Sequence, residues 1–79
     1  MNVTVTNNSS RIIGVVRGEW ILHLDRNEWT DFQCDEEEDF EIRTLPYPTI
    51  AYYRYQSAEA LDVEVEDKPK VSAGAHPTI

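Results

Sequence analysis

Apolar and polar residues alternate with a period of two over most of the chain. The clearest example is segment 61–66, in which Leu61, Val63 and Val65 alternate with acidic residues. This period is typical of β-strands that turn one side toward a core and the other toward solvent. We expect strands over residues 3–6, 11–17, 20–24, 29–34, 40–45, 49–55 and 61–66.

Clusters of turn-forming residues separate these segments. Residues 7–10 are Asn-Asn-Ser-Ser, residues 25–28 are Asp-Arg-Asn-Glu, and two prolines flank Tyr47. Such residues favour turns or interrupt strands. About six or seven short strands, with turns about every eight to twelve residues, are typical of two packed sheets or a closed sheet. The sequence therefore predicts an all-β fold, a small antiparallel β-sandwich or barrel.

Segments 20–24 and 29–34 are predicted to pair as a hairpin across the turn at 25–28. The alternation assigns one face of the two segments to the core, comprising Trp20, Leu22, Leu24, Thr30, Phe32 and Cys34. Trp29 lies on the opposite face.

The alternation stops after Asp67. Residues 68–79 contain small residues, two prolines, Lys68 and Lys70, without any period. Such composition is typical of flexible or extended segments. We expect an acidic β domain over residues 1–67 and a flexible or extended C-terminal arm over residues 68–79. Removing the arm is expected to abolish docking and to leave the fold intact.

The length of 79 residues limits the chain to one domain with a thin core. Cys34 is the only cysteine, which excludes an intramolecular disulfide, and with only two histidines the sequence argues against a structural zinc site. Small domains without such cross-links commonly gain stability by association. We therefore expect the chain to bind a protein assembly or a second copy of itself, and we predict no cofactor.

The charge is unevenly distributed. Residues 1–27 carry three basic and two acidic side chains, residues 28–67 carry two basic and thirteen acidic ones, and residues 68–79 carry two basic ones, for a net charge of −8. Such a charge repels nucleic acids and anionic membranes and attracts basic proteins. We expect a protein partner, no direct binding of nucleic acid and no membrane binding.

The N-terminal residues lack a basic start followed by an apolar run, and no stretch approaches the length needed to span a membrane. We expect a protein without a secretory signal peptide, located in the host cytoplasm or in a virion.

Two acidic groups are candidate contact sites. The first is the run Asp35, Glu36, Glu37, Glu38 and Asp39. It is interpreted as a solvated loop, as a calcium site or as a docking patch for a basic partner. The second is the row Asp62, Glu64 and Glu66, spaced by about 6.6 Å along one strand face. This row is interpreted as a solvated face or as an imitation of a phosphate backbone.

Aromatic side chains exceed what so small a core needs, because the chain has eight of them. Tryptophan and tyrosine are enriched at the centres of interfaces. Trp29 and Tyr47 are the candidates for partner contact, since both lie outside the core pattern.

His23, Asp25 and Cys34 are the residues from which a nucleophilic site would have to be built. The alternation assigns Cys34 to the core face and His23 and Asp25 to the opposite one. We therefore predict no catalytic or metal site and no enzymatic activity.

Two segments carry a resemblance to small all-β proteins of tailed phages. These proteins typically begin with Val-x-Val-x-Asn and later show Leu-x-Pro-Gly-Glu before another strand. Here Val3, Val5 and Asn7 match the first pattern, and residues 24–28, Leu-Asp-Arg-Asn-Glu, match the second with Arg-Asn in place of Pro-Gly. The resemblance covers the first third of the chain. It implies a role in a virion, such as capsid decoration or the joining of virion parts, with no catalytic residues.

The leading interpretation is therefore a structural protein of a phage-like particle. The alternative is a small acidic phage inhibitor of a host defence or nucleic-acid enzyme, comparable to anti-CRISPR proteins or DNA mimics.

Overall fold

Eight strands account for most of the structure, a computed structural model that describes residues 1–44, 49–67 and 70–76. Over these ranges the chain has no helix long and apolar enough to cross a membrane. The strands are β1 (Asn2–Asn7), β2 (Ile13–Arg17), β3 (Trp20–Leu24), β4 (Trp29–Gln33), β5 (Asp39–Thr44), β6 (Thr49–Arg54), β7 (Ala60–Glu66) and β8 (Lys70–His76).

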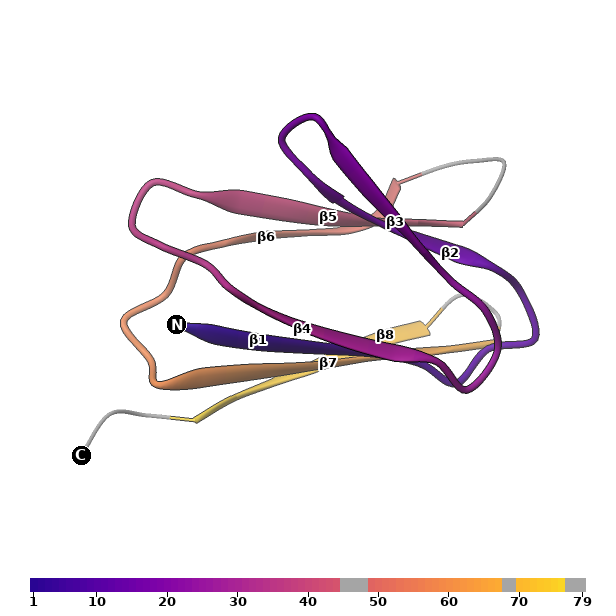
Figure 1. Ribbon diagram of the computed structural model, residues 1–79. Coiled ribbons are helices and arrows are strands. Elements are labelled where there is room, and N and C mark those ends of the chain that lie inside the picture. Colours follow the sequence, from indigo (N-terminus) through magenta and orange to yellow (C-terminus); the bar gives the residue numbers. More distant parts are fainter. Residues whose placement is uncertain (45–48, 68–69, 77–79) are drawn as a thin grey trace.

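Two four-stranded sheets pack face to face (Figure 1). Sheet A has the order β4-β1-β7-β8, and sheet B has the order β3-β2-β5-β6. All neighbouring strands are antiparallel except β1 and β7, which run parallel because both start at the same end of the sandwich (Figure 1). The prediction of an all-β fold with a small β-sandwich is confirmed.

The core lies between the sheets and follows the predicted alternation. Its buried members are Val3, Val5, Ile13, Val15, Leu24, Cys34, Phe40, Ile42, Leu61, Val63 and Val65. Phe40 is the largest of them. Its ring stacks on Tyr53 with centroids 5.1 Å apart and meets Phe32 edge-on at 5.2 Å. These rings link β5 and β6 of sheet B to β4 of sheet A.

The predicted hairpin between segments 20–24 and 29–34 is wrong, because β3 belongs to sheet B and β4 to sheet A. Instead, β3 pairs with β2 across the two-residue loop Gly18-Glu19. Gly18 has a φ of 56°, which is typical of the first loop position of a type II′ hairpin. The turn after β3 then crosses from one sheet to the other.

Asn7 fixes this crossing. Its side chain is fully buried, and its amide nitrogen donates to the carbonyl oxygens of Arg11, Leu24 and Asp25 at 2.7, 3.0 and 3.2 Å. Its amide oxygen accepts from the backbone N–H and the hydroxyl of Ser9 at 3.0 and 2.6 Å. One side chain therefore connects the end of β1, the β1–β2 loop and the end of β3.

The expected C-terminal arm is not confirmed over residues 70–76, which form β8. This strand pairs with β7 along its whole length, from Ala60 opposite His76 to Glu66 opposite Lys70. The apolar period is hidden there because the residues facing sheet B include Ala73 and Ala75, whose side chains are small. Removing residues 68–79 would thus remove a strand of sheet A and expose the edge of β7, so we expect this truncation to destabilise the fold.

Candidate functional site

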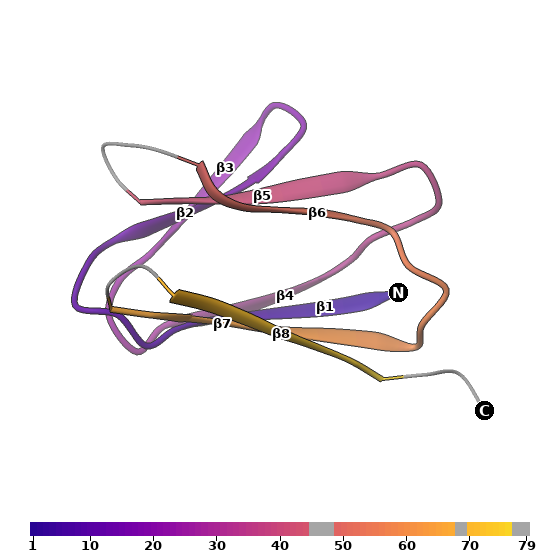
Figure 2. The ribbon, with the colours of Figure 1, turned by 180° about the vertical axis from the view of Figure 1, so that it is seen from behind.

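The sandwich is open along the side where the edge strands β3 and β4 lie. A groove of about 260 Å³ opens there, and we call it the β3–β4 groove. Its lining consists of Val15, Arg17, Trp20, Ile21, Leu22, Thr30 and Phe32. The groove exists because the tip of the β2–β3 hairpin stands away from sheet A (Figures 1 and 2).

Three consecutive apolar residues of β3 are exposed at this groove. The exposed fractions are 80% for Trp20, 50% for Ile21 and 47% for Leu22. Trp20 and Leu22 lie opposite Arg17 and Val15 of β2, on the side of the sheet that faces the core, whereas Ile21 lies on the outer side. Exposed apolar residues that cluster in this way mark interaction sites in soluble proteins.

The floor of the groove is held in place by Arg17. Its guanidinium carbon lies 4.2 Å from the centroid of the Phe32 ring, and its terminal nitrogen donates to the carbonyl oxygen of Gln33 at 3.4 Å. Phe32 in turn packs on Phe40 in the core. Arg17 therefore links sheet B to sheet A beneath the exposed tryptophan.

A wider cavity of about 600 Å³ adjoins the groove at the hairpin tip and shares Arg17 and Trp20 with it. Four carboxylates line this cavity, which we call the acidic end: Glu19, Glu37, Glu38 and Asp39. Three residues of the predicted acidic run thus lie beside the groove, and the run itself is exposed, as expected of a solvated loop.

A tight turn shapes the acidic end. Glu38 donates its backbone N–H to the carbonyl oxygen of Asp35 at 3.0 Å, and its carboxylate accepts the backbone N–H of Asp35 at 2.9 Å. Glu37 has a φ of 70°. The Tyr52 hydroxyl donates to the Asp39 carboxylate.

A second charged surface is the outer face of sheet A. It carries Asp31, Asp62, Glu64 and Glu66, and we call it the acidic face. Trp29, which is 62% exposed, and Glu64 both lie in register with Thr6. The face is not purely acidic, because His76 Nε2 lies 2.6 Å from the Asp62 carboxylate.

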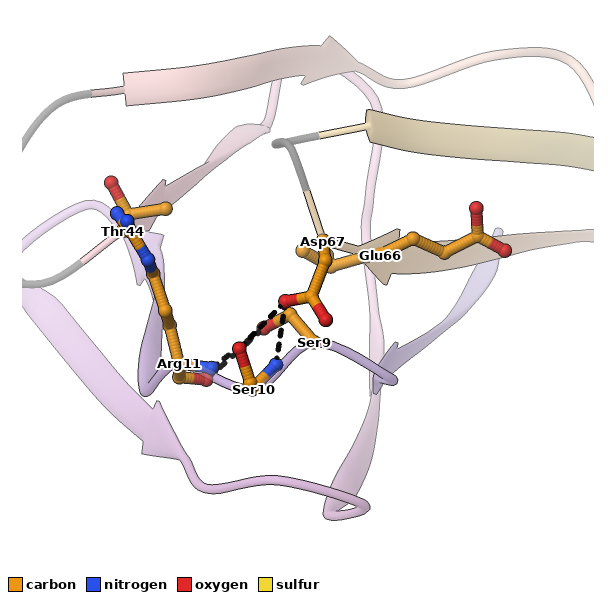
Figure 3. A pocket seen from close by; sticks show the side chains of 7 residues that line it. Ser9, Ser10, Arg11, Thr44, Glu66 and Asp67 are labelled. Carbon is orange, nitrogen blue, oxygen red and sulfur yellow. Dashed lines mark hydrogen bonds between the residues drawn. The ribbon is translucent and has the colours of Figure 1, made fainter.

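A pocket of about 280 Å³ lies at one end of the sandwich, between the β1–β2 loop and the ends of β5 and β7 (Figure 3). Ser10 donates its backbone N–H and its hydroxyl to one Asp67 oxygen, both at 2.8 Å (Figure 3). These bonds hold the pKa of Asp67 below its ordinary value, the backbone bond most strongly. A carboxylate held in its ionised form is a weak general base. We therefore interpret this pair as a loop anchor.

The candidate nucleophilic residues do not meet. Cys34 is buried between the sheets, and burial is the main cause of the raised pKa of its thiol. His23 is exposed on β3, in the other sheet, opposite Gly14. Among the residues that the structure describes, no three His, Cys, Asp or Glu side chains converge as a metal site would require.

The predicted contact residues fall on two separate surfaces. Trp29, Asp62, Glu64 and Glu66 share the acidic face, whereas the loop 35–39 adjoins the hairpin tip through Glu37, Glu38 and Asp39. Tyr47 and Lys68 lie outside the described residues, and Lys70 begins β8.

Trp20, Ile21 and Leu22 were not predicted as contact residues, since Trp20 and Leu22 were assigned to the core. That assignment is wrong for both, because the hairpin stands away from β4 and leaves an open groove there instead of a packed core. The available signal was the apolar character of both strand faces directly after the Gly18-Glu19 turn.

Comparisons of the chain with protein-family models, with curated proteins and with solved structures gave no match.

Proposed function

We propose that the chain is a non-enzymatic binding protein that serves as a structural component of a phage-like virion, as a decoration or a joint. It docks on a larger protein assembly through the β3–β4 groove. The observation that supports this most strongly is Trp20, a tryptophan on the core-facing side of its sheet that remains 80% exposed. A partner that covers the groove would complete the sandwich on its open side.

The virion setting rests on the phage-like sequence pattern. In that pattern Pro-Gly occupies the centre of the turn where this chain has Arg26-Asn27. The Asp25 carbonyl oxygen accepts the backbone N–H of Glu28 at 3.1 Å across the turn, and Asn27 has a φ of 66°. A glycine at the third position of a type II turn has a similar conformation. The replacement therefore retains the turn that the pattern requires.

Co-sedimentation tests this proposal. Tagged protein would be expressed during phage infection, and particles would be separated on a density gradient and probed for the tag. The wild-type chain should migrate with particles, and Trp20→Ser should remain at the top of the gradient. Trp29→Ser is the matched control, because it removes an exposed tryptophan from the acidic face. Equal migration of wild type and Trp20→Ser would contradict docking through the groove.

The acidic face favours a second candidate function, inhibition of a host defence or nucleic-acid enzyme by charge mimicry. Carboxylates on alternate residues of β7 are separated by about 6.6 Å, close to the phosphate spacing of a nucleic-acid strand. The triple variant Asp62→Asn, Glu64→Gln, Glu66→Gln should abolish inhibition, and binding of the wild type should weaken steeply with salt. Inhibition that survives the triple variant would exclude charge mimicry.

A further inference from the structure

We infer that the β3–β4 groove binds an extended segment of a partner protein and that this segment pairs with the free edge of β3. In the partner segment, alternating apolar residues are followed by lysine or arginine. This inference rests on the proposed function, since it specifies how docking through the groove occurs. The added strand would become the fifth strand of sheet B.

β3 is the least protected edge of the sandwich. Natural proteins commonly blunt edge strands with charged residues, prolines or bulges. Of the four edge strands in the described part of the chain, β4 contains Asp31, β6 contains Arg54 and β8 contains Lys70, whereas β3 has no Asp, Glu, Lys or Arg. Its pairing with β2 also continues without a bulge. An edge of this kind is suited to strand addition.

The groove determines which side chains the added strand needs. Every neighbouring pair in sheet B is antiparallel, so we expect the added strand to run antiparallel to β3. Because alternate residues point to one face, about every second side chain would enter the groove beside Trp20, Leu22 and Phe32. Apolar side chains are needed there to replace the water now in contact with these residues.

The acidic end determines where the basic residues of the partner segment should lie. It adjoins Trp20, the first residue of β3, so the C-terminal end of an antiparallel segment would lie there. Four carboxylates line this position together with Arg17, which is already engaged by Phe32 and Gln33. Arg54 lies beside three of these carboxylates in an adjoining pocket, so the four carboxylates and two cations leave a net charge of −2. The basic residues of the partner should therefore follow its apolar residues.

The same charges argue against a second copy of the chain as the occupant. Antiparallel pairing of two β3 edges would place Glu19 and the adjoining carboxylates of each copy near the turn 25–28 of the other, which carries two acidic side chains and one basic one. Each copy also has a net charge of −8. A basic segment of another protein avoids this repulsion.

Selection from a random heptapeptide library against the immobilised full chain tests the inference. We expect enriched peptides to alternate apolar residues and to end with lysine or arginine. Peptides with the basic residues first should bind about two- to tenfold more weakly in low salt, and the difference should shrink in high salt. The inference would be overturned by enriched peptides whose basic residues do not follow the apolar ones, or by no enrichment over a blank surface.

Two neighbouring residues of β3 provide matched variants. Leu22→Lys places a charge in the groove, whereas His23→Lys places one on the outer face, outside the groove lining, where His23 is exposed opposite Gly14. Leu22→Lys should lose binding of the enriched peptides, and His23→Lys should retain it. If Leu22→Lys does not fold, Trp20→Ser replaces it, since Trp20 contributes little buried area. Retained binding in both groove variants would overturn the inference.

Backbone hydrogen exchange separates this inference from the proposed function. If the added strand pairs with β3, amides of β3 should become protected when an enriched peptide binds. If peptide binding depends on Trp20 but the β3 amides are not protected, strand pairing is refuted and the proposal of docking through the groove is unaffected. Unchanged particle binding by Trp20→Ser would refute the proposed function itself. A dimer in sedimentation equilibrium that Leu22→Lys dissociates would identify a second copy as the occupant and overturn the inference.

Discussion

Replacing Asn7 by alanine should destabilise the protein strongly, although Asn7 is remote from the groove. The buried amide has two N–H donors directed at three carbonyl oxygens, and its oxygen accepts two bonds from Ser9. Alanine would leave these groups without their partner in a site that the fold shields from water. Polar groups that lose their partners in such a place cost more than an exposed hydrogen bond.

The magnitude follows from the number of bonds. Two N–H donors and one acceptor, counted as three hydrogen bonds at about 1 kcal/mol each, give a loss of about 3 kcal/mol. For a domain of this size, that corresponds to a fall in Tm of about 10 to 25 °C. Asn7→Asp should lose more, because a carboxylate would direct an acceptor at the carbonyl oxygens of Arg11, Leu24 and Asp25.

Urea unfolding followed by circular dichroism measures these losses. Asn8→Ala is the control, because Asn8 is exposed and donates its backbone N–H to Val65 at 2.8 Å. It should change the free energy of unfolding by less than about 0.5 kcal/mol. A loss below about 1 kcal/mol for Asn7→Ala, or an Asn7→Asp variant as stable as wild type, would refute the role assigned to Asn7.

Three further predictions concern stability and titration. In the same urea assay, Phe40→Ala should lower the free energy of unfolding by about 3 to 5 kcal/mol. The exposed control Trp29→Ala should lower it by less than about 0.5 kcal/mol. Equal losses in the two variants would contradict the packing described for Phe40. Cys34 should react with a thiol reagent far more slowly in the folded protein than in urea, and because its folded pKa is raised, stability should fall as the pH rises above about 9. The pKa of Asp67, followed by NMR, should lie below its ordinary value and rise partway in Ser10→Ala, since the backbone N–H still donates; an unchanged pKa would exclude the hydroxyl as a cause. Because the folded pKa is lowered, the stabilisation by Asp67 should be present above its unfolded pKa and be lost as the pH falls through the folded one.

The layers of the sandwich could be predicted from sequence because alternation reports directly on burial. Val3, Val5, Leu61, Val63 and Val65 all lie in the core as their period indicates. Strand pairing could not be predicted in the same way, since alternation does not specify a neighbour. The turn 25–28 was assigned to a hairpin, but the bonds of Asn7 direct it from one sheet to the other.

The candidate site was predictable only in part. The acidic run and the row on β7 are visible as charge patterns, and both are exposed. The groove depends on how far the β2–β3 hairpin stands from β4 of the other sheet, and the alternation within each strand does not specify that spacing. Trp20 and Leu22 therefore have the sequence pattern of core residues and the surroundings of surface residues.

The parallel pairing of β1 with β7 has a consequence for the order of folding. Val3 lies opposite Leu61, so the centre of sheet A joins two strands that are more than fifty residues apart in sequence. In sheet B, by contrast, β2, β3 and β5 are close in sequence and can pair early. Contacts between distant segments slow folding because a long loop must close first. On the ribosome, β1 must therefore remain unpaired with β7 until residues 60–66 have emerged, while the hairpin with the exposed tryptophan is already complete.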